Sequence, residues 1–167
     1  NIELKKAILS FLPVDSHYKQ FISETDKWLK DFSPKMLKEL IRRVNKWLDK
    51  QQKEKNKEKA FDYLRGVIDD WYNKEIFSYD RLKYFDRLYR ETKDLARVYG
   101  IKWRNINPTQ LETFRSWLLE DFALSSSLIK YAIQEAVKRK RDGQPSLKYI
   151  EDNFINPLKN NEIRTVR

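Results

Sequence analysis

The stretch Asn107–Lys140, NPTQLETFRSWLLEDFALSSSLIKYAIQEAVKRK, decides the fold. It opens on Asn-Pro-Thr, which is typical of a helix start because asparagine caps the end and proline fits the first turn. Apolar residues then recur three and four positions apart, first through Leu111–Leu118 and again through Leu128–Val137. This spacing places them on one face of a helix. The stretch therefore predicts two amphipathic helices, the second beginning around Ser125 and ending on basic residues.

The same helical spacing continues outward from this stretch in both directions. Pro13 ends the first apolar stripe, Asp15 or Ser16 can cap the second, and Ser33-Pro34 can start the third. Gly100 is suited to the left-handed conformation that ends a helix. No segment alternates with period two, and three glycines are too few for a turn-rich β fold. An all-α protein is expected, and its remaining apolar stripes run through residues 4–12, 21–29, 37–48, 61–72, 79–99 and 147–154.

Charge favours an anionic partner. The 167 residues carry a net charge of +10, of which about +4 falls in residues 1–77 and about +6 in residues 78–167. Nucleic acid ranks ahead of a membrane surface or an acidic protein, although composition alone does not choose among them. The chain has no cysteine, no apolar run near the roughly 18 to 20 residues that span a bilayer, and no signal-peptide pattern. We expect a cytoplasmic, nucleoid-associated protein and, because the chain starts at Asn1 without a methionine, a fragment of a longer one.

An internal repeat is visible when the two halves of the chain are aligned. Trp28 then pairs with Trp117, and Tyr63 pairs with Tyr149. Any two amphipathic helical stretches can be slid into partial register, but the shared order of features favours a true repeat. We expect two tandem multi-helix repeats, residues 1–77 and 78–167, with the long helix Tyr79–Tyr99 as a bridge. The aligned segments are Phe21–Val44 with Leu111–Ala136, Met36–Ile41 with Leu128–Ile133, and Phe61–Ser78 with Leu147–Thr165.

These residues resemble the C-terminal domain of the DnaD/DnaB primosome proteins, which initiate replication and load the helicase in low-GC Gram-positive bacteria and their phages. The family signature in the last helix is Tyr-x3-Ile-x3-Trp. The first copy matches it with Tyr63, Val67 and Trp71, whereas the second keeps Tyr149 but has Asn153 and Pro157. The tandem arrangement is more similar to the DnaB type. The resemblance implies DNA binding, contact with helicase and helicase loader, no catalysis, and an N-terminal oligomerisation domain that is missing here.

Basic runs and signature aromatics are the candidate DNA contacts. In each copy a lysine-rich run precedes the tyrosine-bearing helix, so Lys/Arg phosphate contacts could combine with aromatic stacking on bases. Alternatives remain open: a basic run can simply complement a helix C-terminus, and signature aromatics can be core. For Trp71, which ends its helix, we expect partial exposure. The candidate contacts are Lys50, Lys53, Lys55, Lys57, Lys59, Tyr63, Trp71, Lys74, Lys138, Arg139, Lys140, Arg141, Lys148 and Tyr149.

Catalytic and metal-binding patterns are not found in the sequence. His17 is the only histidine and has no cysteine to accompany it. The carboxylate pairs Asp69-Asp70 and Glu120-Asp121 are adjacent, so on a helix they point about 100° apart. We therefore expect no enzymatic activity, no metal and no cofactor. The rival hypothesis is a protein-interaction adaptor whose basic surface binds an acidic partner such as the helicase or its loader.

Overall fold

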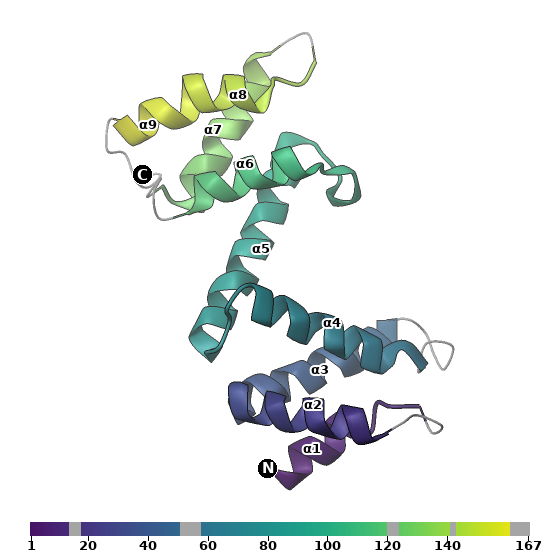
Figure 1. Ribbon diagram of the computed structural model, residues 1–167. Coiled ribbons are helices and arrows are strands. Elements are labelled where there is room, and N and C mark those ends of the chain that lie inside the picture. Colours follow the sequence, from purple (N-terminus) through teal and green to yellow (C-terminus); the bar gives the residue numbers. More distant parts are fainter. Residues whose placement is uncertain (14–17, 51–57, 120–123, 141–142, 161–167) are drawn as a thin grey trace. The chain divides into compact units, whose positions relative to one another are not determined.

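The computed structural model describes residues 1–13, 18–50, 58–119, 124–140 and 143–160, and these residues form helices joined by short connections (Figure 1). The predicted all-α class is confirmed. The expected cap at Asp15 or Ser16, and also His17 and Glu120-Asp121, lie outside the described residues. The elements are α1 (Ile2–Leu9), α2 (Tyr18–Asp31), α3 (Pro34–Lys50), α4 (Ala60–Asn73), α5 (Tyr79–Tyr99), η2 (Trp103–Asn105), α6 (Pro108–Leu118), α7 (Ser126–Arg139), α8 (Leu147–Ile150), η3 (Glu151–Ile155) and α9 (Asn156–Asn160).

The chain divides into two compact units, Asn1–Tyr84 (unit 1) and Phe85–Arg167 (unit 2). The division falls inside α5, so the helix expected as a bridge contributes residues to both units. None of the described helices is long and apolar enough to cross a membrane.

Unit 1 is built from α1 to α4 around a core rich in aromatic rings. Ser33 caps α3 as predicted: its Oγ accepts from the Met36 backbone N–H at 3.2 Å. One face of α3 is buried, and α4 packs beside it. The Phe61 ring contacts Trp28, which joins α4 to α2. The buried residues of α3 and α4 are Met36, Leu37, Leu40, Val44, Ala60, Phe61, Leu64, Ile68 and Trp71.

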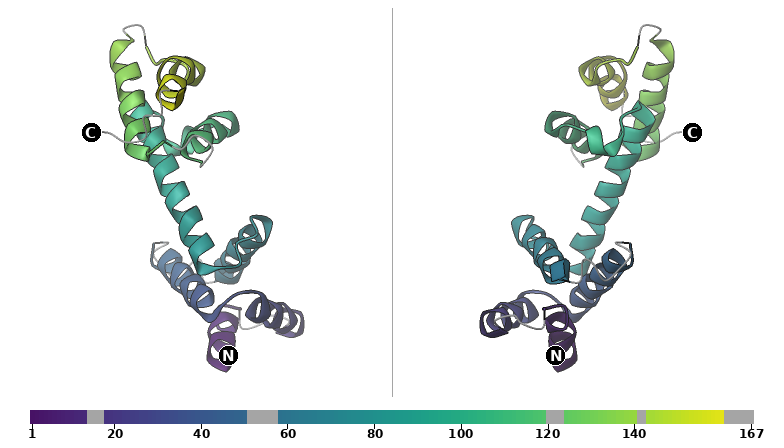
Figure 2. Two further views of the ribbon diagram at one scale, coloured as in Figure 1. Left: turned by 90° about the vertical axis from the view of Figure 1, so that its left-hand side faces the viewer. Right: turned by 90° about the vertical axis from the view of Figure 1, so that its right-hand side faces the viewer.

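Unit 2 gathers α6, α7 and the C-terminal helical segment around the second half of α5 (Figures 1 and 2). Asn107 and Gln110 form a reciprocal capping box at the start of α6, as the Asn-Pro-Thr pattern indicates. An ion pair of 3.2 Å between Lys130 and Asp94 joins α7 to α5. The core of this unit includes Leu95, Phe114, Trp117, Ile129, Ile133, Ile150 and Ile155.

The burial pattern agrees with the proposed repeat. In α3 the buried positions are Met36, Leu37, Leu40 and Val44, and in α7 the aligned positions Leu128, Ile129, Ala132 and Ala136 are buried too. Trp28 and Trp117, which the alignment pairs, are both buried. These shared buried positions are consistent with the repeat, which remains a prediction.

Two helices end in the same backbone geometry with different residues. At the end of α5, Gly100 takes φ +102° and the Ile101 N–H donates to the Ala96 carbonyl at 2.9 Å. At the end of α4, Glu75 takes φ +55° and the Ile76 N–H donates to the Trp71 carbonyl at 2.8 Å. Both are left-handed C-terminal caps, in which glycine is favoured because it has no Cβ. The predicted role of Gly100 is confirmed.

Candidate nucleic-acid interface

Two cations lie over two aromatic rings where α7 ends and α8 begins. Lys140 Nζ lies 5.6 Å from the centroid of the Tyr149 ring, and Arg139 Cζ lies 5.6 Å from that of Phe154. The centroids of the two rings are 6.0 Å apart. Tyr149 is 39% exposed, and both basic residues are exposed. We call these four residues, Arg139, Lys140, Tyr149 and Phe154, the α7–α8 cluster.

Hydrogen bonds fix the connection that brings α7 and α8 together. The Tyr99 hydroxyl donates to the Pro145 carbonyl at 2.6 Å, and Gln144 Nε2 donates to the Tyr99 carbonyl at 2.6 Å. Ser146 then caps α8 by accepting from the Tyr149 N–H at 3.1 Å. Burial raises the pKa of the Tyr99 hydroxyl, so this group remains a hydrogen-bond donor. The start of α8, and with it the position of Tyr149, is therefore set by contacts with the end of α5.

A π turn, Glu151–Ile155, lies where the second copy departs from the family signature. Proline lacks an N–H, and in an α-helix its ring would clash with the carbonyl four residues earlier, that of Asn153. The wider turn ends at Ile155, two residues before Pro157, and is closed by a hydrogen bond from the Asn156 N–H to the Glu151 carbonyl. Asn153 Nδ2 donates to the Tyr149 carbonyl at 3.0 Å, which supplies a side-chain partner within the turn. The π turn thus behaves as a one-residue insertion.

This insertion shifts the register of the aligned helices. Before the π turn, Leu64 of the first copy aligns with Ile150 of the second copy. Beyond the turn, Ile68 corresponds to Ile155, one position later than in the sequence alignment. All four are buried. In the same shifted register Val67 pairs with Phe154, not with Asn153. Phe154 was not among the predicted contacts, although Pro157 is a sequence signal for a disturbed helix ahead of it.

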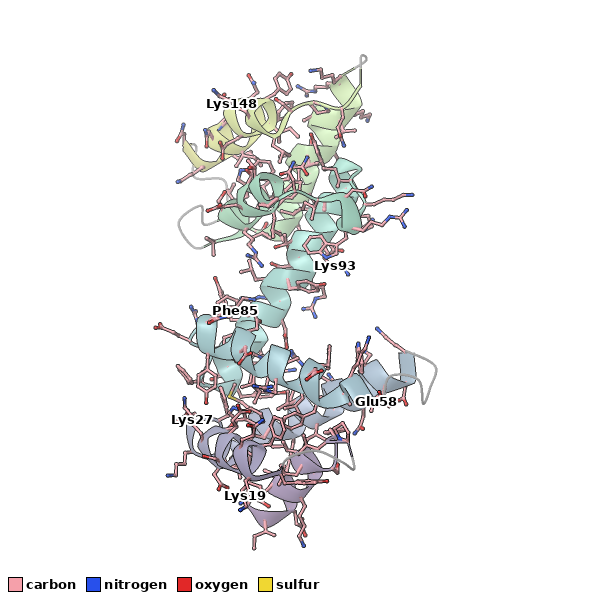
Figure 3. The ribbon with its side chains drawn as sticks, turned by 45° about the vertical axis from the view of Figure 1, so that its right-hand side comes forward. Lys19, Lys27, Glu58, Phe85, Lys93 and Lys148 are labelled. Carbon is pink, nitrogen blue, oxygen red and sulfur yellow. The ribbon has the colours of Figure 1, made fainter. Side chains whose placement is uncertain are left out.

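The charges of the α7–α8 cluster are only partly neutralised. Arg139 Nε lies 3.7 Å from Glu135 Oε2 on the preceding turn, with most of the arginine exposed. Lys138, in the last turn of α7, is exposed as well. Lys140 and Lys148 have no acidic partner among the described residues, and Lys148 projects from the start of α8 (Figure 3). Exposed cations next to exposed rings can bind phosphate groups and stack against unpaired bases.

In unit 1 the corresponding aromatics are packing residues. Tyr63 is half-buried and stacks on Trp47, with ring centroids 4.8 Å apart and planes 9° apart. The expectation that Trp71 is partly exposed is wrong: it is 1% exposed, because the end of α4 packs edge-on against Phe32, which directly follows α2. Its ring has no surface to offer a ligand.

The lysines predicted in unit 1 lie in different environments. Lys50 and Lys59 are exposed at the end of α3 and just before α4. Lys74 is paired with Asp70 at 3.0 Å. These three lysines belong to unit 1, whereas the α7–α8 cluster belongs to unit 2. Four predicted contacts lie outside the described residues: Lys53, Lys55, Lys57 and Arg141.

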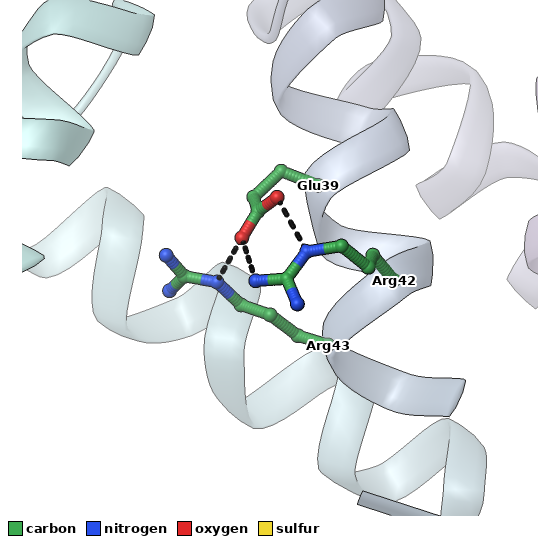
Figure 4. Close-up of polar contacts among 3 residues, drawn as sticks. All are labelled: Glu39, Arg42 and Arg43. Carbon is green, nitrogen blue, oxygen red and sulfur yellow. Dashed lines mark hydrogen bonds and ion pairs between the residues drawn. The ribbon is translucent and has the colours of Figure 1, made fainter. Parts of the chain in front are cut away.

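Two arginines of α3 in unit 1 are bound by one carboxylate. Glu39 accepts from Arg42 Nε at 2.9 Å and from Arg43 Nε at 3.1 Å, all three on α3 (Figure 4). The hydrogen bonds from Arg42, assisted by Arg43 and opposed by burial, lower the pKa of Glu39 from 4.5 to about 2. The glutamate therefore stays ionised and offsets part of the positive charge on this helix.

The fold and the α7–α8 cluster define the class of protein. It is a small all-helical protein of two compact units, and basic and aromatic side chains are exposed together on the second unit. The described residues contain no group of three potential metal ligands. Residues 101–167 match the sequence model of a family described as replication initiation and membrane attachment. This match over residues 101–167 supports the resemblance to the DnaD/DnaB primosome proteins. No curated protein and no solved structure matches the chain.

Proposed function

We propose that this chain is a DNA-binding component of replication initiation that assists loading of the replicative helicase. Its partners would be single- or double-stranded DNA and other primosome proteins, among them the helicase and its loader. The family match supports the replication role, and the net charge of +10 supports a polyanionic partner.

The α7–α8 cluster is the observation that carries the DNA-binding proposal. Lys140 and Arg139 supply positive charge, and Tyr149 supplies an exposed ring beside it. A Lys or Arg that contacts a phosphate releases counterions and adds sequence-independent affinity. An exposed ring adds stacking with any unpaired base. The cluster therefore fits binding with little base specificity and some preference for single strands.

Fluorescence anisotropy with labelled single- and double-stranded oligonucleotides tests the proposal. Arg139→Ala/Lys140→Ala should weaken binding to both strand forms. Tyr149→Leu should weaken binding to single strands about fivefold or more and leave duplex binding nearly unchanged. Lys38→Ala/Lys46→Ala is the matched control, because these two exposed lysines of α3 carry equal charge and lie outside the cluster. Equal reductions in affinity for the cluster variant and the control would reject the cluster as the binding site.

An adaptor role is the second candidate function, favoured by a different surface. Phe77, between α4 and α5, is 48% exposed and stacks on Phe32 with ring centroids 5.8 Å apart. Lys27 Nζ lies 5.1 Å from the centroid of the neighbouring Tyr72 ring. An exposed phenylalanine beside a cation suits an acidic partner protein with an apolar anchor. Phe77→Ser should abolish capture of helicase or loader without changing DNA affinity if this role is correct.

A further inference from the structure

A separate exposed surface of unit 2 combines aromatic rings with unneutralised cations. It consists of Tyr89, Arg90 and Lys93 on the second half of α5, together with Trp103 and Arg104 of η2. We call it the α5–η2 face. None of its residues belongs to the α7–α8 cluster, and those on α5 precede the segment that matches the family.

The two aromatic rings of this face are in contact with each other. Tyr89 is 49% exposed and meets Trp103 edge-on, with centroids 5.5 Å apart. Trp103 is half-buried and packs against the core of unit 2, which fixes the pair in place. Lys93 Nζ lies 5.3 Å from the Tyr89 centroid and 5.8 Å from the Trp103 centroid, and Figure 3 shows Lys93 on the exposed side of α5.

Further basic residues lie on the side of α5 that carries Lys93, and on η2. Arg90, Lys93 and Arg97 are spaced by three and four residues, so they share one side of α5. The nearby carboxylate of Asp94 is engaged at 3.2 Å by Lys130 and at 3.8 Å by Arg97. Arg90, Lys102 and Arg104 are exposed and have no acidic partner within the described part of the chain.

We propose that the α5–η2 face is a second nucleic-acid contact site, and that its ligand is a single strand. Unpaired bases stack on the exposed ring of Tyr89 beside Trp103, and Arg90 and Arg104 contact the flanking phosphates. Lys93 can exchange its exposed contact with the rings for a phosphate, since such contacts at the surface are weak. A duplex supplies the phosphates but keeps its bases paired and out of reach of the rings. The ring pair therefore selects the strand form.

Tyr89→Leu is the discriminating variant, because it removes the exposed ring without changing charge, while Trp103 keeps its packing against the core of unit 2. It should weaken single-strand binding about fivefold and leave duplex binding unchanged. Arg90→Ala/Arg104→Ala should weaken single-strand binding more than the equally charged control Lys38→Ala/Lys46→Ala. Tyr89→Phe keeps the ring and should bind like the unmodified chain.

Three outcomes would overturn the proposal. Tyr89→Leu could bind single strands as well as the unmodified chain does. It could weaken single-strand and duplex binding equally, which would indicate a structural effect. The Arg90/Arg104 variant could lose affinity for a poly-glutamate peptide and not for the single strand, which would assign the face to an acidic protein. Tyr149→Leu tests the α7–α8 cluster independently, so failure of either site is distinguished from failure of the other.

Discussion

The Tyr63 ring stacks flat on Trp47, with centroids 4.8 Å apart and an interplanar angle of 9°. Tyr149, which aligns with Tyr63 in the repeat, instead lies exposed under Lys140. One residue type at matched positions thus has two environments. In unit 1 the tyrosine links α4 to α3, and in unit 2 it is available to a ligand.

Substitution of the two tyrosines should therefore affect different properties, stability for Tyr63 and single-strand affinity for Tyr149. Tyr63→Ala should lower the free energy of unfolding by about 1–3 kcal/mol, since it removes a half-buried ring and its stacking interaction. It should leave DNA affinity unchanged. Tyr149→Ala should lower single-strand affinity and cost little stability. Urea denaturation and anisotropy on the same two variants separate the effects, and a large drop in affinity for Tyr63→Ala would contradict this division.

The π turn predicts that deletion of Asn153 and the substitution Pro157→Ala have coupled effects on stability. Deletion of Asn153 alone would return the helix to α register and place the proline ring against a backbone carbonyl, at a cost of about 3 kcal/mol. The same deletion combined with Pro157→Ala should recover most of that stability, because Ile150 and Ile155 would still share the buried face. Thermal unfolding of the two single variants and the double variant measures the coupling. Additive effects would mean that Pro157 does not impose the π turn.

The Glu39 site predicts a pH dependence of stability. The pKa of Glu39 is lowered from 4.5 to about 2 in the folded chain, so the folded state binds this proton less readily than the unfolded state does. The stabilisation is therefore present above about pH 4.5 and is lost as the pH falls toward 2. The Arg42 side chain is 58% exposed, which reduces the expected contribution to on the order of 1–2 kcal/mol. The Glu39→Gln variant should be less stable at pH 7, and its free energy of unfolding should change less as the pH falls. An acid dependence equal to that of the unmodified chain would contradict the assignment.

At the two left-handed caps, introducing a glycine and removing one should change the free energy of unfolding in opposite directions. Glu75→Gly should raise the free energy of unfolding by about 0.5–1 kcal/mol, because φ +55° strains a residue with a Cβ. Gly100→Ala should lower it, since φ is +102° there and the new Cβ would lie 3.2 Å from Gln144 Nε2. Thermal melts of both variants under one condition check the pair of signs.

Most of the fold could be predicted because its helices are amphipathic and their ends carry clear signals. Ser33-Pro34, Asn107-Pro108 and Gly100 each mark a helix end that the structure confirms. Tertiary packing was harder to predict. The helical period places Tyr63, Val67 and Trp71 on one face, but only the packing of α4 against α2 and α3 decides which of them water can reach.

The candidate sites were less predictable than the fold. The basic run at Lys138–Lys140 was identified from sequence because its charges are consecutive. Phe154 was missed because a single proline shifts the register of the helix ahead of it. The α5–η2 face was missed because its cations alternate with acids along the chain and separate only on the folded helix. The pairing of an aromatic and a basic residue four apart, as in Tyr89 and Lys93, is the sequence signal for its centre.

The most direct test of DNA binding through the basic residues 138–141, which include Arg139 and Lys140 of the α7–α8 cluster, is the salt dependence of single-strand affinity. It should be measured for the unmodified chain and for Lys138→Ala/Arg139→Ala/Lys140→Ala/Arg141→Ala, with circular dichroism to verify the fold. Each phosphate interaction that the substitutions remove should reduce the slope of log affinity against log salt by about 0.7. We expect steep salt dependence in the unmodified chain and a slope smaller by about 1.5–3 in the variant. Equal slopes in the two proteins, or no binding at low salt, would contradict this role of the cluster.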